Sequence, residues 1–562
     1  MALPDETVID LVKKSGVLDP ASIKKAEDYA VATRSPSLVS AFVESGVLTE
    51  EKLGAVIAGY YKVPYIALSK VTIPEDVAHI VPEKVARRHK AIAFARDADG
   101  IKVAMDDPGN KTFLAFIARK TGERAIPYYS DSKEIEGTIQ LYKKALQKTI
   151  DELLKEHVRL ATTVRGSELP VIKIVDELIT AAYQDRASDI HIEPEEKTSL
   201  IRFRIDGVLQ DVLRVPRDLH DRIISRIKVL SNLRTDEHMS AQDGKMMMAL
   251  EVENLDIRVS ILPITYGEKA VLRLLSSRSR EYTLSDLGMN SPDLQKVTNA
   301  FNKTFGMILS TGPTGSGKTT TIYAILKILN TRDKNIMTIE DPVEYRIGGA
   351  NQVQVNAKTN LTFANGLRSI LRQDPNIIFV GEIRDSDTAA IAVNAALTGH
   401  LVLSTLHTND AATAIPRLSD MKIEPFLVAS TVNIIIAQRL VRQICNTCKT
   451  TEIIPMTDIT KHFSEELTKK HFGTKSEITV YKGKGCKICR QTGYLGRLGI
   501  FEVLEVTKGI RKLITEKADA DVINRSAIAE GMKTMLDDGL QKVAEGLTTL
   551  EEVLRVTKVE SL

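Results

Sequence analysis

Hydrophobic positions in the first 145 residues follow a helical spacing and then a short alternating pattern. The segment IDLVKKSGVL at 9–18 is echoed by VSAFVESGVL at 39–48. Each copy ends after a glycine turn and is followed by an N-cap residue, Asp19 or Thr49, which predicts a small helical bundle. Two apolar runs within 92–105 flank the turn residues 97–100 and predict a β-hairpin. We therefore expect a helical and α+β module at 1–145, a charged helix at 141–160 and a polar linker at 146–168.

From residue 170 the pattern changes to a two-residue alternation. Apolar residues at 201, 203 and 205 alternate with polar residues that include two arginines, and Asp206-Gly207 predicts a tight turn into the next strand. A second alternating strand at 255–261 carries Arg258 on its polar face. The pattern predicts a strand-rich domain at 169–275 that presents basic side chains from a sheet, followed by a linker at 276–289.

Residues 290–562 change pattern again, to short continuous apolar runs that alternate with helical segments. The runs lie at 307–309, 335–339, 376–380 and 401–405. Continuous apolar strands separated by helices are typical of an α/β domain with a parallel sheet.

The first of these runs leads into a phosphate-binding loop of the form G-x-x-x-x-G-K-[ST]. A loop of this kind surrounds a phosphate with main-chain N–H groups, the lysine reaches the β- and γ-phosphate oxygens, and the hydroxyl can bind Mg²⁺. The alternative is a glycine-rich turn that binds nothing, which the strand before it and the helix after it disfavour. We expect ATP and Mg²⁺ to bind, with Thr319 as the magnesium ligand, at Gly312, Pro313, Thr314, Gly315, Ser316, Gly317, Lys318, Thr319 and Thr320.

Charged residues follow the other apolar runs. Glu340 follows the second run, Glu382 the third, and His407 the fourth. Because parallel strands end at the same edge of a sheet, these side chains should lie near the nucleotide. We predict that Glu340 orients or deprotonates water, that Glu382 lies on the magnesium side and that His407 senses the γ-phosphate. The alternatives are helix-capping acids and a structural histidine.

Composition adds little to this interpretation. The chain has 562 residues, 43% of them hydrophobic and 27% charged, with a formal net charge of +3. This composition excludes wholesale disorder and gives no global indication of nucleic-acid binding. We see no secretion signal and no apolar stretch that reads as a membrane span, so we expect a cytoplasmic protein without direct membrane insertion.

All four cysteines lie in two C-x-x-C pairs. In a cytosolic chain two such pairs predict one tetrahedral structural zinc site, and the alternatives are redox-active pairs or buried thiols. The predicted zinc ligands are Cys445, Cys448, Cys486 and Cys489.

Several strings resemble motifs of the secretion ATPases of type II secretion and type IV pilus systems. TIEDPVE at 338–344, GEIRD at 381–385 and TGHLVLSTLHTN at 398–409 are similar to the Asp box, Walker B motif and His box of that family. ASDIHIEP at 187–194, RFRIDG at 202–207 and YGEKAVLR at 266–273 resemble strings in the domain that precedes the ATPase core. The resemblance runs from about residue 169 to the C-terminus.

The resemblance implies a fold and a set of domains. It implies a RecA-like P-loop ATPase core at 290–562, preceded by a PAS-like α+β domain at 169–275. Within the core it implies a zinc-binding insert at 441–498 and a helical region at 505–562. The N-terminal module resembles the leading domain of assembly ATPases in VPEKVA at 81–86 and VAMDDPGN at 103–110.

The resemblance also implies a function. It implies a hexameric ring that hydrolyses ATP to extend type IV pili through a platform protein and other components of the inner membrane, at its cytoplasmic face. Arg258 and Arg273 match arginines that such proteins direct at the γ-phosphate, although either could instead belong to a solvated sheet face. AQDGK at 241–245 departs from the family pattern, which leaves any nucleotide role for Lys245 open.

Other functions stay open at this point. Type II secretion uses the same parts as pilus extension, whereas the tetracysteine insert disfavours a pilus-retraction motor. A DNA-translocating P-loop motor or a nucleotide-binding scaffold without turnover would fit less well. Some relatives bind cyclic di-GMP through Arg-Leu-Gly, but here the matching positions are Ser37-Leu38-Val39, so that ligand is not expected.

Overall fold

The computed structural model describes residues 5–33, 39, 42–43, 47–68, 71, 73–138, 171–250, 253–276, 282–486 and 488–557. The chain divides into two compact units, one of residues 1–142 with 282–562 and the other of residues 143–281. The helix expected at 141–160 and the linker expected at 146–168 lie wholly outside the described residues, as does about half of the second repeat copy. Among the described helices, none combines the length and apolar character needed to traverse a bilayer.

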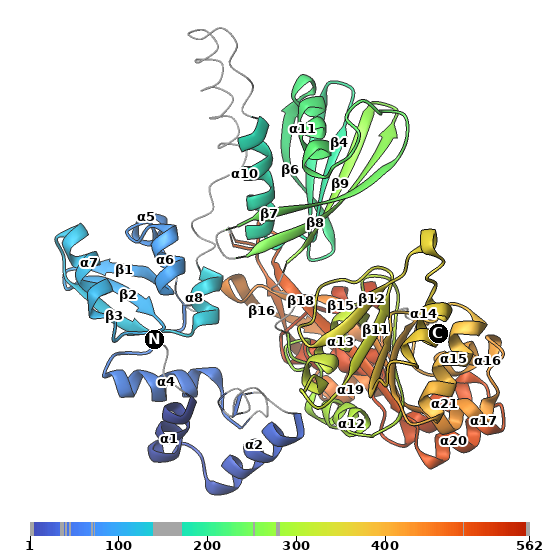
Figure 1. Cartoon of the computed structure of the whole chain (residues 1–562). Coiled ribbons are helices and arrows are strands. Elements are labelled where there is room, and N and C mark those ends of the chain that lie inside the picture. The colour runs from blue at the N-terminus through green and yellow to red at the C-terminus, as the bar shows by residue number, and fades with distance from the viewer. Residues whose placement is uncertain are drawn as a thin grey trace. The chain divides into compact units, whose positions relative to one another are not determined.

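The N-terminal residues form a helical part followed by a small sheet (Figure 1). Asp19 and Thr49 accept hydrogen bonds from the main-chain N–H groups of Ser22 and Lys52, which confirms both as N-caps. Strands β1 and β2 are antiparallel and meet at the turn before Gly100, which confirms the hairpin, and β3 joins β2 in parallel. The elements are α1 Asp5–Ser15, α2 Pro20–Thr33, α4 Glu50–Tyr61, α5 Glu75–Ala78, α6 Glu83–His89, β1 Ala91–Asp97, β2 Gly100–Met105, α7 Lys111–Thr121, β3 Ala125–Tyr129 and α8 Ser132–Thr138.

The unit of residues 143–281 is an antiparallel sheet with helices on one face. Its strand order is β6-β5-β4-β9-β8-β7. The apolar residues at 201, 203 and 205 are buried in one core with α10 and α11, which confirms the alternation, and Asp206-Gly207 makes the predicted turn. The elements are α10 Val171–Gln184, β4 Asp189–Pro194, β5 Thr198–Ile205, β6 Val208–Pro216, α11 Arg217–Leu230, β7 Gln242–Ala249, β8 Asn254–Ile264 and β9 Gly267–Leu275.

Residues 282–562 are built on a seven-stranded mixed sheet of order β12-β11-β13-β14-β10-β15-β18. The strands are parallel except that β18 is antiparallel to β15, which confirms the predicted α/β class. The first elements are α12 Ser291–Phe301, β10 Gly306–Thr311, α13 Lys318–Leu329, β11 Ile336–Glu340, β12 Ala350–Gln354, α14 Phe363–Ile370, β13 Ile377–Val380, α15 Ser386–Leu397, β14 Leu401–Leu406, α16 Ala414–Asp420, α17 Pro425–Thr431 and β15 Val432–Ile444.

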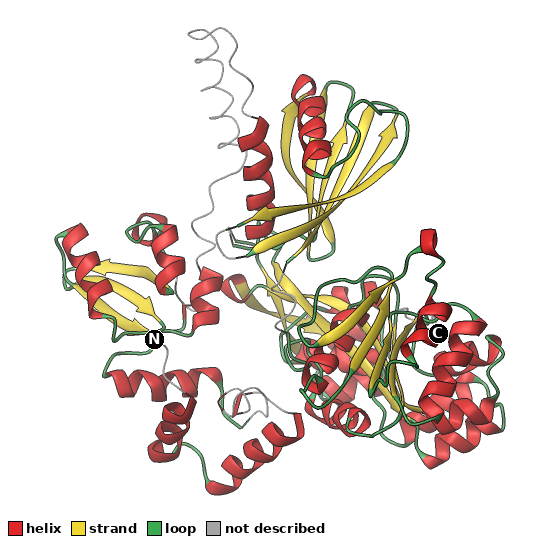
Figure 2. Ribbon diagram, in the orientation of Figure 1, coloured by secondary structure: helices red, strands yellow, loops and turns green. Residues whose placement is uncertain are grey.

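Helices cover both faces of this sheet (Figure 2). One core joins the sheet to α12 and α13, and the other joins it to α14, α15, α16 and α17 together with C-terminal helices. Because β10, β11, β13 and β14 are buried along their whole length, they read in the sequence as continuous apolar runs rather than as alternating ones. The sheet therefore presents its polar groups at the strand ends.

The C-terminal part adds a two-stranded antiparallel sheet, β16-β17, and several helices to the last two strands of the central sheet. Strands β15 and β18 extend to Ile444 and from Tyr494, so the ends of the insert expected at 441–498 belong to the central sheet. Leu284 and Met289, which lie in the expected linker 276–289, are buried in the core. The remaining elements are β16 Lys449–Pro455, α18 Met456–Thr460, α19 Glu465–Phe472, β17 Glu477–Gly483, β18 Tyr494–Glu505, α20 Lys508–Thr515, α21 Ala520–Ala529, α22 Met535–Ala544 and α23 Leu550–Val556.

Candidate functional site

The predicted phosphate-binding loop connects β10 to α13. Gly312 and Gly317 have φ values of 142° and 92°, which side chains rarely tolerate. A Cβ atom at Gly312 would lie 2.5 Å from the Ser316 hydroxyl and 2.6 Å from the carbonyl oxygen of Gln438. The glycines thus let the main chain turn tightly against β15, and the strand, loop and helix follow each other as predicted.

Lys318 is buried at the first turn of α13, where it is 8% exposed. Its ammonium group donates to the carbonyl oxygens of Gly312 at 2.7 Å and Pro313 at 3.1 Å. Burial lowers the pKa of Lys318 to about 8, against the opposing charge of Glu382 and with a smaller contribution from Arg439. An anion held in this loop would stabilise the charged lysine and raise its pKa again.

The parallel strands bring the predicted polar groups to one edge of the sheet. Ile339 lies opposite Val380, Val380 opposite Ser404, and Thr311 opposite Leu406. Glu340 and Gly381 directly follow Ile339 and Val380, and His407 and Gly312 directly follow Leu406 and Thr311. All four therefore lie at the carboxyl ends of β11, β13, β14 and β10.

Glu382 contacts an arginine and a histidine at this edge. Its Oε2 atom accepts from Arg384 Nε at 2.7 Å and lies 3.2 Å from His407 Nε2. The residue that caps α15 is Asp385, whose carboxylate accepts from the N–H of Thr388 at 2.8 Å. Helix capping is therefore wrong as the explanation of Glu382, while Arg384, in the same string, was not singled out.

Glu340 lies in a buried hydrogen-bond network and is 2% exposed. Its carboxylate accepts from Thr338 Oγ1 at 2.6 Å, from Gln352 Nε2 at 3.1 Å and from the hydroxyl of Tyr323 on α13. Burial raises the pKa of Glu340 even though these donors stabilise its charge, and a raised pKa suits a base that works near neutral pH. Tyr323 and Gln352 carried no motif signal, and the role of Glu340 toward water stays a prediction.

Arg258 and Arg273 are neighbours in the other unit. The register places Arg258 directly opposite Arg273, and Lys245 directly opposite Arg258, on the polar face of β7, β8 and β9. We call Lys245, Arg258 and Arg273 the basic row. Like charges directly opposite each other destabilise a sheet, and the role of Arg258 and Arg273 toward the γ-phosphate stays a prediction.

An acidic residue partly neutralises the end of the basic row. Asp189 lies opposite both Arg273 and Arg204 across β9, β4 and β5. Its carboxylate accepts from Arg273 Nε at 3.0 Å and lies 3.4 Å from Arg204 Nε. The Arg273 side chain remains 58% exposed in this arrangement.

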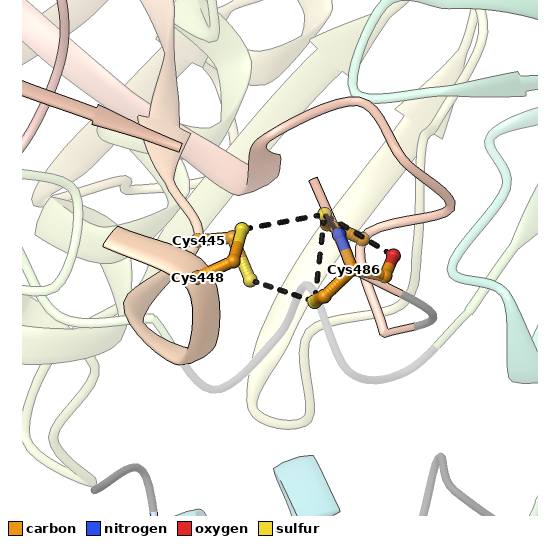
Figure 3. A group of neighbouring side chains, drawn as sticks. Cys445, Cys448 and Cys486 are labelled. Atoms are coloured by element: carbon orange, nitrogen blue, oxygen red, sulfur yellow. Dashed lines mark hydrogen bonds between the residues drawn. The ribbon is translucent and has the colours of Figure 1, made fainter. Parts of the chain in front are cut away.

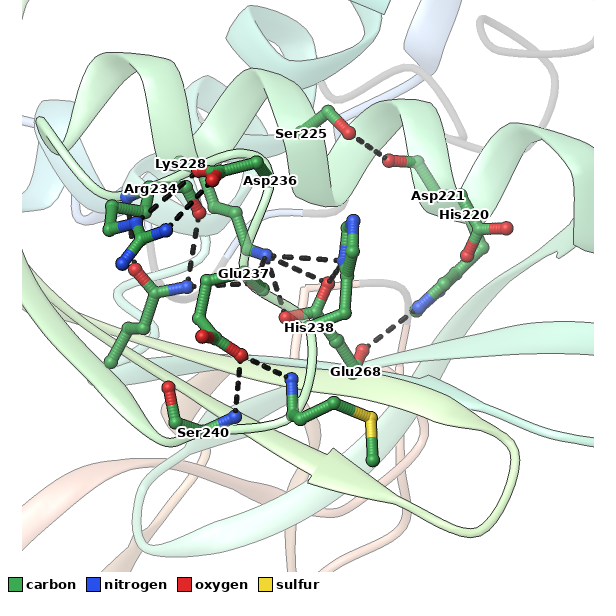
Figure 4. A network of polar contacts seen from close by, with 12 residues as sticks. His220, Asp221, Ser225, Lys228, Arg234, Asp236, Glu237, His238, Ser240 and Glu268 are labelled. Carbon is green, nitrogen blue, oxygen red and sulfur yellow. Dashed lines mark hydrogen bonds and ion pairs between the residues drawn. The ribbon is translucent and has the colours of Figure 1, made fainter.

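A buried ion pair fixes the loop that leads into β7 (Figure 4). Lys228 of α11 is fully buried and its ammonium lies 2.7 Å from Oε1 of Glu268, the second residue of β9. Lys228 also donates to the carbonyl oxygen of Glu237 at 2.6 Å, and His238 Nδ1 lies 2.7 Å from Glu268 Oε2. The pair therefore joins α11, the loop and β9, which fixes the strands that carry the basic row.

The four cysteines converge from two separate segments (Figure 3). Their sulfur atoms all lie within 4.8 Å of one another, and none of the four is in a disulfide. Sγ of Cys445 lies 3.8 Å from Sγ of Cys486, and Sγ of Cys448 lies 3.7 Å from that of Cys489. Burial raises the pKa of Cys448 and of Cys486. Four converging thiols without a disulfide fit a tetrahedral metal site.

The family of the chain follows from comparison with known proteins. The Type II/IV secretion system protein family matches residues 165–555. This range includes the phosphate-binding loop, Glu340 and Glu382, the basic row and the cysteines. The chain belongs to this family. The MshEN domain matches residues 61–148, upstream of that region. The predicted pilus or secretion ATPase is confirmed at the level of the family.

The most similar curated relatives include both pilus and secretion proteins. The chain is 37% identical over 560 residues to the type IV pilus assembly ATPase PilB of Myxococcus xanthus, a match that covers 97% of this chain and 98% of the relative. It is 42% identical over 470 residues to the type II secretion system protein E of Pseudomonas aeruginosa, covering 84% of this chain and 90% of the relative. It is also 47% identical over 391 residues to the putative type II secretion system protein E of Escherichia coli, covering 69% and 77%.

A solved structure supports the fold. The Legionella pneumophila ATPase DotB superposes with a TM-score of 0.52 at 21% identity, covering 70% of this chain and 97% of that structure. The RecA-like secretion ATPase fold predicted for the core is confirmed.

Proposed function

We propose that the chain is a hexameric ATPase that works at the cytoplasmic face of the inner membrane and powers the extension of type IV pili through a platform protein. The match to a pilus assembly ATPase over 97% of this chain carries the proposal, because it includes the N-terminal module as well as the ATPase core. The tetracysteine cluster supports assembly over retraction, as the family resemblance implies.

The edge of the central sheet would bind and hydrolyse ATP. Main-chain N–H groups of 312–320 would surround the phosphates, and the Lys318 ammonium would exchange its carbonyl partners for phosphate oxygens. Thr319, on the first turn of α13, and Glu382 would hold Mg²⁺, which offsets the phosphate charge when bound. His407, which contacts Glu382, would respond to the terminal phosphate.

The basic row would supply the positive charge that hydrolysis needs. Arg258 and Arg273 would act as arginine fingers, either on the nucleotide of their own chain or on that of a neighbouring chain. Phosphate release by purified full-length protein, with Mg²⁺ present, tests the activity, and the sedimentation coefficient tests the hexamer. A protein that binds ATP without releasing phosphate would be a nucleotide-binding scaffold.

The cysteine cluster would hold one structural zinc ion. Four thiolates leave no coordination position open for chemistry, so zinc would stabilise the hairpin β16-β17 and the ends of β15 and β18. We expect about one zinc per chain by atomic emission. Cys486→Ser should lose the metal and lower the Tm, whereas Thr450→Ser, on β16 outside the cluster, should keep both. Full metal content and an unchanged Tm in Cys486→Ser would contradict a zinc site.

Type II secretion is the second candidate function, because curated secretion relatives reach 42% and 47% identity with the chain. Deletion of the gene in its own host separates the two. Loss of surface pili with normal export of secreted enzymes would support pilus extension. Loss of export with normal pili would support type II secretion instead.

A further inference from the structure

Strand β15 forms a wall of the phosphate-binding loop. It runs parallel to β10, with Ala437 opposite Thr311, and continues past the point where β10 ends and the loop begins. Gln438 Nε2 donates to the carbonyl oxygen of Ser316 at 2.8 Å, so this strand contacts the loop directly. The side chain of the next residue, Arg439, leaves the opposite face of β15 and reaches Asn409, which follows the carboxyl end of β14, although Arg439 belongs to no recognised motif.

Arg439 makes few contacts for a partly buried arginine. One terminal nitrogen donates to Asn409 Oδ1 at 3.1 Å. Its Nε atom is buried and has no hydrogen-bond partner among the described residues. Burial lowers the pKa of Arg439, against the charge of Asp410. A buried donor without a partner is unfavourable, which is expected at a site whose ligand supplies the missing acceptor.

Arg439 is also connected, through its contact with Asn409, to the predicted site residues at the carboxyl ends of the strands. The charge of Arg439 makes a small contribution to the lowered pKa of Lys318, after the larger effect of burial. Asn409, its partner, is two residues from His407, and His407 contacts Glu382. An anion bound near Lys318 and Arg439 would offset the charge of both.

We propose that Arg439 is a further nucleotide-binding residue, whose guanidinium donates to the terminal phosphate of ATP held in the phosphate-binding loop of its own chain. The proposal rests on the proposed binding of ATP at that loop. It is distinct from the basic row, because Arg439 lies on β15, next to the strand β10 that leads into the phosphate-binding loop, and belongs to the same unit as that loop. A residue on the terminal phosphate should distinguish ATP from ADP.

The test compares the binding of ATPγS and of ADP, each with Mg²⁺, to full-length protein by isothermal titration calorimetry. Arg439→Gln should weaken ATPγS binding about 10- to 100-fold, the range for losing a hydrogen bond to a charged group, and should weaken ADP binding less than about three-fold. Arg525→Gln, at an exposed position of α21, serves as the control and should leave both affinities unchanged. Equal losses for the two nucleotides, or no loss for either, would overturn the proposal.

A second variant covers the possibility that Arg439→Gln does not fold. Arg439→Lys keeps the charge but loses the planar fork of donors, so ATPγS should bind about 3- to 10-fold more weakly while ADP binding stays the same. Equal or absent effects in this variant also overturn the proposal. If the unaltered protein binds neither nucleotide, the proposed ATP site itself is wrong, which is a separate result.

Discussion

The two groups of cations that the proposed mechanism uses are stabilised in opposite ways. Lys318 is 8% exposed and donates to main-chain carbonyl oxygens of a loop that is continuous with it in sequence. Arg273 has a side chain that is 58% exposed, and it pairs with a carboxylate brought opposite by sheet register. The comparison shows that the loop cation depends on local sequence, whereas the basic row depends on how distant strands align.

The largest expected effect comes from removing the loop cation. Lys318→Ala should weaken ATP binding at least about 100-fold, because two charge-assisted contacts to phosphate are lost, and should lower phosphate release about 1000-fold. Lys327→Ala, an exposed lysine of the same helix, is the matched control and should bind and hydrolyse ATP normally. Calorimetry and a phosphate-release assay measure the two effects. Unchanged ATP affinity in Lys318→Ala would remove the loop from the site.

The next largest effect tests whether Glu340 is the catalytic base. Glu340→Gln should leave ATP binding near normal and lower hydrolysis at least about 100-fold, on the usual scale for losing a catalytic base. Glu344→Gln is the informative comparison, because Glu344 is the next glutamate along the chain and its charge acts on Glu340. Full turnover in Glu340→Gln together with loss of turnover in Glu344→Gln would show that Glu344, and not Glu340, is the base.

Local motifs in the sequence predicted the surroundings of Lys318 better than the arrangement of the basic row. The glycines, Lys318 and the strand before them form one continuous motif, so their arrangement could be predicted directly. Alternation predicted that Arg258 lies on a polar sheet face, but no local pattern specifies which strands pair. The alignment of Arg258 with Arg273 and Lys245, and the pairing with Asp189, therefore appear only in the structure.

Residues without a motif were missed for a related reason. Tyr323 and Gln352 reach Glu340 from separate elements, and Arg439 lies in a strand whose sequence is mainly apolar. The expected linker at 276–289 looked polar, yet Leu284 and Met289 pack into the core. The polar composition of this segment did not predict that two of its apolar side chains are buried.

A smaller effect is the pH dependence of ATP binding, which tests whether burial lowers the pKa of Lys318. Because the pKa of Lys318 is about 8 without a nucleotide and rises when phosphate binds, ATP binding should take up a proton above that pH. ATP affinity should therefore fall about five-fold between about pH 8 and pH 9, and the binding enthalpy should depend on the ionisation enthalpy of the buffer. Lys318→Arg does not titrate in this range and should show no proton uptake. Uptake that is the same in both proteins would assign the proton to another group.

The central claim is that ATP bound at the loop is hydrolysed only when the basic row completes the site. The most direct measurement is single-turnover hydrolysis by full-length protein carrying Arg258→Gln and Arg273→Gln together, with Arg202→Gln as a control on the same sheet. The account predicts near-normal ATP binding, hydrolysis about 1000-fold slower in the double variant, as for the loss of an arginine finger, and normal hydrolysis in the control. Hydrolysis at the unaltered rate in the double variant would contradict it.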